Sequence, residues 1–254
     1  MAAFRPSPAP RIANRERLIF ALDVPDLKGA QRLVEQLGET IVFYKIGLEL
    51  ATSRHYFELL DWLVARDKKV FADLKLYDIP ATVTAAVRQL SKSGASFLTV
   101  HGDRAIMEAA AGAKGPDLKV LVVTVLTSIA PRDLAEMGIG LAVEELVTLR
   151  ARQAVAAGCD GVIASGLEAA ALRRALGAAP LIVTPGIRPA DGARNDAGRD
   201  GRGRATDDQR RVVTPTLALE AGADYLVVGR PIRDAADPYR AAAAIQEEIA
   251  RACG

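Results

Sequence analysis

The chain has few of the residues that build metal sites, disulfide scaffolds or membrane spans. Its 254 residues include only two histidines and two cysteines, and Cys159 and Cys253 lack the spacing of metal ligands. This scarcity disfavours a histidine-based zinc site, and it favours a reduced protein of the cytoplasm over a disulfide scaffold. No stretch approaches the roughly 20 apolar residues of a membrane span, so we expect no membrane segment.

An excess of charge of either sign is also missing. The 33 basic and 31 acidic side chains leave a formal charge of +2, which predicts neither a nucleic-acid-binding nor a membrane-binding surface. Half of the residues are hydrophobic, enough for one large core, and this length is typical of a single α/β barrel. The arginine- and proline-rich residues 1–17 predict a flexible tail before a domain at 18–254, and their arginines are also compatible with a short transit peptide.

Strand-like and helix-like patterns alternate along the whole domain. Eight short apolar runs are followed in turn by eight alanine- and leucine-rich segments with helical spacing, which predicts a TIM (β/α)8 barrel. The expected strands are 18–24, 42–48, 69–76, 97–101, 119–127, 161–165, 181–186 and 225–229, and the expected helices are 26–37, 51–66, 81–93, 104–113, 142–157, 167–176, 215–221 and 238–251. The connections 128–141 and 188–214 are longer than the others and follow strand ends, where barrel enzymes keep their loops.

The third expected strand carries charges where a strand should be apolar. Side chains alternate across a strand, so Asp73 and Lys75 project from the same face as Phe71, while the other face is apolar. One interpretation is a solvated surface strand. The flanking helical patterns instead indicate a parallel sheet that is covered on its outer face. Inner charges must then pair or cost several kcal/mol each, which makes them candidates for a functional site.

A polar residue ends every expected strand. The set is Asp23, Lys45, Asp73 with Lys75, His101, Thr127, Ser165, Arg188 and Arg230. The last two follow Gly186 and Gly229 at strands seven and eight, where many barrels bind phosphate. Glycine lets the backbone approach an anion and arginine can hold it with two hydrogen bonds, so we predict a phosphate site rather than mere tight turns.

Taken together, these motifs resemble those of the orotidine 5'-phosphate decarboxylase family. In chain order they are Ala21-Leu22-Asp23, Tyr44-Lys45-Ile46-Gly47, Asp73-x-Lys75-x-x-Asp78-Ile79-Pro80, residues 184–189, Gln209-Arg210-Arg211 and Gly229-Arg230. The Asp-x-Lys-x-x-Asp element alone is shared with sugar-phosphate lyases of the same fold, whereas the full set favours the decarboxylase. One departure from the family pattern is the extra length between Pro189 and Gln209.

The resemblance implies an activity and a set of roles. The activity is decarboxylation of orotidine 5'-phosphate to uridine 5'-phosphate (UMP), the last step of de novo pyrimidine synthesis, without a metal or an organic cofactor. Lys75 would stabilise a carbanion at C6 of the pyrimidine and then protonate it. The family is homodimeric, so Asp78 and Thr82 would reach the active site of the other subunit. The roles implied for the remaining residues are a charge network for Lys45, Asp73, Lys75 and Asp78, ribose binding for Asp23, contact with the pyrimidine edge for Thr127, and phosphate binding for Arg188, Gln209, Gly229 and Arg230.

Two other functions stay open at this point. A sugar-phosphate lyase or decarboxylase of the same superfamily would use paired carboxylates to hold Mg²⁺, so metal dependence distinguishes it. A catalytically silent barrel that senses a phosphorylated ligand would bind nucleotide without turnover. Several inward charges are costly for a protein that only binds, which argues against the silent barrel.

Overall fold

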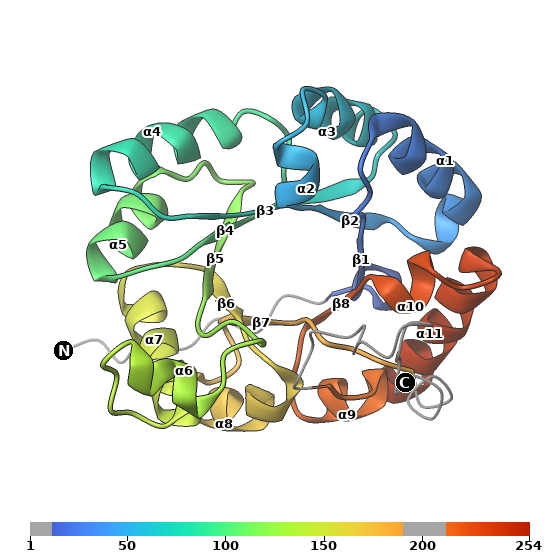
Figure 1. Cartoon of the computed structure of the whole chain (residues 1–254). Helices are drawn as coiled ribbons and strands as arrows, with labels where there is room; N and C mark the ends of the chain where they lie inside the picture. Colours follow the sequence, from blue (N-terminus) through green and yellow to red (C-terminus); the bar gives the residue numbers. More distant parts are fainter. Residues whose placement is uncertain (1–11, 190–211) are drawn as a thin grey trace, which may run out of the picture.

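The computed structural model describes residues 12–189 and 212–254, and it shows a closed barrel of eight parallel strands (Figure 1). Each strand pairs with the next along the chain, and β8 pairs with β1 to close the barrel. The predicted TIM barrel is therefore confirmed. The strands are β1 Leu18–Ala21, β2 Phe43–Ile46, β3 Lys69–Leu76, β4 Phe97–Val100, β5 Lys119–Val123, β6 Gly161–Ile163, β7 Leu181–Thr184 and β8 Tyr225–Val228.

Helices surround this barrel on all sides (Figure 1). They are α1 Leu27–Leu37, α2 Leu48–Ala51, α3 Tyr56–Val64, α4 Pro80–Leu90, α5 Arg104–Ala113, α6 Pro131–Glu136, α7 Val143–Ala156, α8 Gly166–Leu176, α9 Pro215–Glu220, α10 Arg230–Arg233 and α11 Pro238–Cys253, with short 3-10 turns at Asn14–Glu16 and Gly38–Thr40. The short helices α6 and α10 were not predicted. The prediction of a single helix at 51–66 was wrong in part, because two shorter helices, α2 and α3, are found there. The Thr52 hydroxyl donates to the Glu49 carbonyl and the Ser53 hydroxyl to the Leu50 carbonyl, and this turn separates the two helices.

Several helices begin at residues that the sequence marks as helix starts. The carboxylate of Asp26 accepts a hydrogen bond from the Gly29 amide at the start of α1, and Asp103 caps α5 in the same way. Pro80 is the first residue of α4, where its missing N–H removes no helical hydrogen bond. Because all eight strands are parallel, their carboxyl ends and the helix starts that follow them lie on one face of the barrel.

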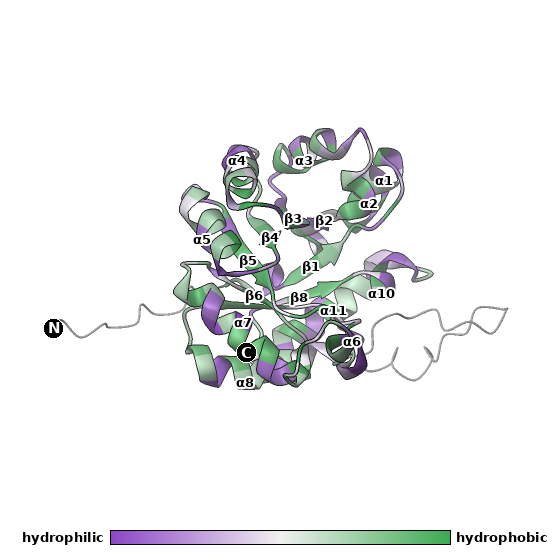
Figure 2. Ribbon diagram, turned by 60° about the vertical axis from the view of Figure 1, so that its left-hand side comes forward, coloured by the Kyte–Doolittle hydropathy of each residue, from purple (hydrophilic) through white to green (hydrophobic). Residues whose placement is uncertain are grey.

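The apolar core has two layers. One lies between the strands and the surrounding helices, and hydrophobic residues prevail along the strands in Figure 2. The other fills the barrel and includes Phe43, Phe71, Phe97 and Tyr225. Edge-to-face contacts join these rings, with centroids 4.9 Å apart for Phe43 and Phe97 and 5.1 Å apart for Phe97 and Tyr225. The interior is therefore solid below the carboxyl ends of the strands.

We call the amino ends of the strands the lower rim and their carboxyl ends the upper rim. At the lower rim, the Arg173 guanidinium lies 2.7 Å from Asp224 Oδ2 and donates to the carbonyls of Pro180 and Gly222. Lys114 pairs in the same manner with Asp160, Nζ to Oδ2 at 2.5 Å. Both carboxylates also accept a backbone amide of a neighbouring strand, so the ion pairs join adjacent strands.

The last residues of the predicted N-terminal tail contact the barrel. Of the predicted tail, residues 12–17 are described, and Glu16 pairs with Lys69 at the start of β3 (Oε2 to Nζ, 2.6 Å). The flexibility predicted for residues 1–17 stays a prediction, because 1–11 lie outside the described residues.

Neither Cys159, which is buried, nor the exposed Cys253 forms a disulfide. In the described part of the chain, no helix is both long enough and apolar enough to span a bilayer.

Candidate active site

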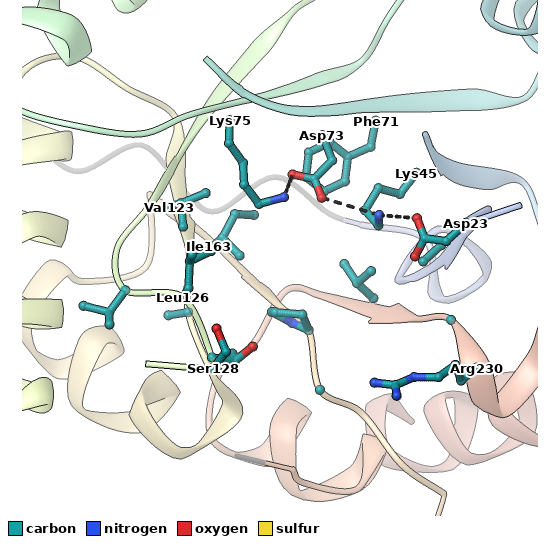
Figure 3. A pocket seen from close by; sticks show the side chains of 18 of the residues that line it. Asp23, Lys45, Phe71, Asp73, Lys75, Val123, Leu126, Ser128, Ile163 and Arg230 are labelled. Atoms are coloured by element: carbon teal, nitrogen blue, oxygen red, sulfur yellow. Dashed lines mark hydrogen bonds and ion pairs between the residues drawn. The ribbon is translucent and has the colours of Figure 1, made fainter. Parts of the chain in front are cut away.

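A cavity of about 620 Å³ opens at the upper rim, over the apolar filling of the barrel (Figure 3). This volume lies within the usual range for sites that bind small molecules. Its lining comes from the ends of β1, β2 and β3 on one side and, on the other, from the ends of β5, β6, β7 and β8 with the segments that follow them. Phe71, Val123 and Ile163 supply apolar surface, so a flat ring and charged groups can both be accommodated.

Four charged side chains form a continuous line along one wall of this cavity, and we call them the ionic chain. Lys45 Nζ lies 3.0 Å from Asp23 Oδ1 and 3.4 Å from Asp73 Oδ2. Lys75 Nζ lies 2.8 Å from Asp73 Oδ1 and ends the chain (Figure 3). Charge alternates along the line, from carboxylate to ammonium to carboxylate to ammonium. The predicted pairing of inward charges is thus present, with Asp73 and Lys75 on the Phe71 face of β3.

Burial and pairing act in opposite directions on the middle of the ionic chain. Burial alone would raise the pKa of Asp73, but the charges of Lys45 and Lys75 outweigh it and hold that pKa below its usual value. Burial would likewise lower the pKa of Lys45, yet Asp73 and Asp23 raise it. Both groups therefore stay charged in a largely desolvated position, with side chains 13% and 12% exposed.

Local sequence explains how the two lysines reach the cavity. Gly47 follows β2, and a Cβ at that position would lie 3.2 Å from Lys45 Nζ and 3.5 Å from Asp23 Oδ1. Any larger residue would crowd the ion pair. Lys75 adopts a left-handed backbone conformation, with φ of 48°, at an irregular point in the pairing of β3 with β4. A non-glycine residue in this conformation is uncommon and is often found at functional sites.

The opposite wall of the cavity carries arginines. Arg188 follows β7 and is buried, and Arg230 opens α10 directly after Gly229 at the end of β8. A Cβ at residue 229 would lie 3.3 Å from that of Ala21, so glycine suits this close packing. Arg233, one turn further along α10, donates to the backbone carbonyl of Asp23 at 2.8 Å. The arginine wall therefore touches the ionic chain at its Asp23 end.

Most of the residues singled out from the sequence line this one cavity. They are Asp23, Lys45, Asp73, Lys75, Thr127, Arg188, Gly229 and Arg230. Asp78 and Thr82 are exposed and are not part of the lining, and Gln209 lies outside the described residues. Ser165 caps α8 through its hydroxyl, and His101 stacks edge-to-face with Tyr77. The roles assigned to all of these residues stay predictions.

Sequence reasoning missed two polar lining residues. Ser128 directly follows Thr127 and shares its polar turn, so the pair could have been considered together. Arg233 lies three residues after Arg230, a spacing that places both on one side of a helix. This spacing is informative only if the segment is known to be helical, and the four-residue helix α10 is too short to show apolar periodicity in the sequence. Among residues 12–189 and 212–254, no three His, Cys, Asp or Glu side chains gather as a metal-binding group.

Comparison with known proteins places this chain in a family. Residues 16–245 match the model of the orotidine 5'-phosphate decarboxylase / HUMPS family. The chain is 53% identical to an orotidine 5'-phosphate decarboxylase of Methylococcus capsulatus over 234 residues, 92% of both proteins. It is 51% identical to that of Stenotrophomonas maltophilia over 95% of both. Among solved structures, it is similar to the orotidine 5'-phosphate decarboxylase of Lactobacillus acidophilus, with a TM-score of 0.77, 34% identity, and coverage of 92% of this chain and 99% of that one. The chain therefore belongs to the orotidine 5'-phosphate decarboxylase / HUMPS family.

Proposed function

We propose that this protein decarboxylates orotidine 5'-phosphate to UMP, with Lys75 as the reacting acid and without a metal or organic cofactor. The observation that carries the proposal is the ionic chain, which ends on the Lys75 ammonium in a cavity whose far wall holds Arg188 and Arg230. A nucleotide with a dianionic phosphate and a flat, charged ring matches these two walls. The proposal agrees with the names of the relatives described above.

The chemical step requires a cation at the reacting carbon. When the bond between C6 and the carboxylate breaks, its electron pair stays on C6 and CO2 leaves. The pyrimidine offers no ring position that delocalises this pair well, so a fixed ammonium beside C6 provides the main stabilisation. Lys75 then transfers a proton from Nζ to C6 to give UMP, and water restores the proton to the amine.

Asp73 has two roles in this scheme. Its carboxylate holds Lys75 Nζ at 2.8 Å and so orients the ammonium toward the ring. It also lies close to where the departing carboxylate would sit, and the repulsion between the two anions ends as CO2 leaves. Ground-state repulsion of this kind is contested as a general source of catalysis, so we assign most of the effect to electrostatic stabilisation by Lys75.

The phosphate supplies binding energy away from the reacting carbon. Arg188, Gly229 and Arg230 hold it in this proposal, while Asp23 binds the ribose and Thr127 the edge of the pyrimidine. Binding energy from a remote group can be used to position and desolvate the ring. Gln209 belongs to the same proposal as a further phosphate ligand.

We infer in addition that the active unit is a cytoplasmic homodimer. Asp78 and Thr82 lie outside the lining of their own cavity and are exposed. Asp78 lies between two large exposed side chains, Tyr77 at 70% and Ile79 at 66%. Apolar surface of this kind is typical of interaction sites. In the dimer, Asp78 and Thr82 reach the partner's cavity.

The test of activity is the fall in ultraviolet absorbance of orotidine 5'-phosphate when purified protein is added, with and without excess EDTA. Rapid loss that EDTA leaves unchanged supports the proposal. Loss only in the presence of Mg²⁺ favours a metal-dependent sugar-phosphate enzyme. UMP binding without any loss of absorbance identifies the silent phosphate-binding barrel.

Mixing two inactive variants tests the shared site. Lys75→Ala removes a residue of the subunit's own cavity, and Asp78→Asn removes one supplied to the partner. After subunits exchange, each mixed dimer contains one intact site, so a 1:1 mixture should recover about a quarter of wild-type activity. No recovery, with exchange verified by mass spectrometry, would place Asp78 and Lys75 in the same site of one chain.

A further inference from the structure

The pairing of β3 with β4 changes register at the ionic chain. Phe71 is opposite Phe97 and Ala72 is opposite Leu98, but Leu76 is opposite Val100. Three residues of β3, Asp73 to Lys75, therefore face a single residue of β4, Thr99. This is a β-bulge with two extra residues, and it contains both of the charged groups that β3 contributes to the cavity.

A bulge interrupts the backbone hydrogen bonds between strands, so its amides need other partners. The Lys75 amide donates to the Thr99 hydroxyl, N to Oγ1 at 3.0 Å. Lys75 is also the residue with φ of 48°. The hydroxyl of Thr99 thus takes the position of the missing strand acceptor at the most distorted residue of β3.

The same hydroxyl fixes the carboxylate of the ionic chain. Thr99 Oγ1 lies 2.8 Å from Asp73 Oδ1. A carboxylate can only accept and an amide can only donate, so the single hydroxyl proton must point to Asp73 while an oxygen lone pair faces Lys75 N–H. Asp73 Oδ1 consequently receives two hydrogen bonds, one from Thr99 and one from Lys75 Nζ.

Burial makes this arrangement specific. Thr99 is fully buried, and its neighbour on the inward face of β4 is Phe97, part of the apolar filling. A valine of the same shape would pack equally well there if the site served only the core. A hydroxyl at this position instead satisfies the Lys75 amide and the Asp73 carboxylate together.

We propose that Thr99 is a positioning residue: its hydroxyl caps the β3 bulge at Lys75 and fixes the Asp73 carboxylate, which sets the direction of the Lys75 ammonium. This inference rests on the proposed function, because Lys75 is the reacting acid there. Thr99 touches neither the substrate nor the transferred proton. Its effect is on the alignment of Lys75 with C6, while the arginine wall is on the other side of the cavity.

The kinetic consequence is a change in turnover rather than in binding. A misplacement of about 1 Å at a reacting group can lower the rate about 100-fold, so Thr99→Val should reduce kcat about 10- to 100-fold. KM and the Kd of UMP should stay within about threefold of wild type, because the ground-state contacts to phosphate and ribose are intact. Thr99→Ser keeps the hydroxyl and should retain kcat within about threefold.

Thr124 provides a matched control. It is also fully buried, directly after β5, and its hydroxyl donates to the Ile163 carbonyl at 2.9 Å, away from the ionic chain. Thr124→Val should lower Tm without changing kcat. A second measurement, independent of turnover, is amide hydrogen exchange: the Lys75 amide should exchange faster in Thr99→Val than in the wild type, Thr99→Ser or Thr124→Val.

The outcomes separate cleanly. The proposal is overturned if Thr99→Val keeps wild-type kcat, if Thr99→Ser is as slow as Thr99→Val, or if Thr124→Val loses as much turnover. If Thr99→Val fails to fold, Thr99→Ala replaces it with the same expectation. A wild-type protein that does not consume orotidine 5'-phosphate contradicts the proposed function instead, and the exchange rate of the Lys75 amide then decides the role of the Thr99 cap.

Discussion

Both rims of the barrel contain buried or half-buried ion pairs, but the pairs differ in how completely they are satisfied. At the lower rim, Asp224 takes one arginine and one backbone amide, and Arg173 spreads its remaining donors over nearby carbonyls. At the upper rim, Asp73 takes two lysines and a hydroxyl. In the described ranges, Asp73 is the only partner of the Lys75 ammonium, which faces the cavity.

This difference indicates what each group of charges is for. Ion pairs that also hold backbone groups tie adjacent strands together, and removing one partner leaves an unpaired charge in a desolvated place. A line of charges that ends on a half-exposed ammonium in a cavity leaves donors available to a ligand. We therefore propose that the lower rim serves stability and the upper rim serves chemistry, a separation usual in barrels of this kind.

The strongest test of this separation is removal of the ammonium that ends the ionic chain. Lys75→Ala should lower kcat at least about 10⁴-fold, because it deletes both the cation and the proton donor, and it should still bind UMP. Stopped-flow absorbance and calorimetry measure the two quantities. Lys92→Ala, at an exposed lysine beyond α4, is the control. Turnover near wild type in Lys75→Ala would remove Lys75 from its proposed role.

The arginine wall should respond differently from the ionic chain. Arg230→Ala should lower kcat/KM by about 10²- to 10³-fold, because a charged partner of the phosphate is lost, and it should weaken UMP binding as well. The Kd of UMP therefore distinguishes it from Lys75→Ala. Arg251→Ala, on the exposed last turn of α11, is the control. Full catalytic efficiency in Arg230→Ala would contradict the assignment of the phosphate site.

At the lower rim, the same kind of substitution should affect stability alone. Arg173→Met should reduce the free energy of unfolding by about 2–4 kcal/mol, because Asp224 and three backbone carbonyls lose the donor that Arg173 supplies. Urea unfolding measures the loss. The neighbouring Arg174 is exposed, so Arg174→Met should change little. A tenfold fall in kcat of folded Arg173→Met at 25 °C would show that the rims are not separable.

The smallest expected effect is a pH dependence at the upper rim. Burial, followed by the charges of Arg150 and Lys75, lowers the pKa of His101 below its usual 6.5. As the pH falls, the unfolded chain therefore protonates His101 before the folded protein does. Neutral His101 thus leaves the free energy of unfolding at its full value above pH 6.5, and this free energy decreases as the pH falls below 6.5. Between pH 7 and pH 5, the Tm of the wild type should fall further than that of His101→Gln. The difference should be at most about 2 °C, because solvent screens a half-exposed ring.

The control for this comparison is the other histidine of the chain. The side chain of His55 is 45% exposed and pairs with Glu58, Nδ1 to Oε2 at 2.8 Å, away from the cavity. The Tm of His55→Gln should keep the wild-type loss between pH 7 and 5. A pH dependence that His101→Gln leaves unchanged would assign the acid sensitivity to other groups.

Much of this architecture follows from the sequence because strand and helix periodicities are strong local signals. The bounds of β3 and α5 agree with the prediction, and the inward face of Asp73 and Lys75 follows from simple alternation. Strands such as β5 end earlier than expected, because the apolar pattern continues past Val123 into a loop, and residues 125–128 of that loop line the cavity.

The features that could not be predicted depend on contacts between strands. The bulge in β3 arises only in its pairing with β4, so Thr99 looks like an ordinary strand residue when read alone. Arg233 binds a carbonyl 210 positions away in the chain, and no local pattern reports such a contact. Periodicity indicates which face a side chain occupies, whereas these interactions depend on register and on closure between β8 and β1.

The proposed functional groups are also distributed along the chain according to the order of the strands around the closed barrel. The first four strands carry the ionic chain and Thr99, and the last four carry Thr127 and the arginine wall. In this proposal, the first half of the polypeptide holds the reacting groups and the second half holds the phosphate-binding groups, and the Arg233 contact to Asp23 joins the two halves where β8 meets β1. Evolution or protein design can keep the anchoring half for phosphorylated ligands and alter the reaction half, which gives one scaffold access to new chemistry on the same class of substrate.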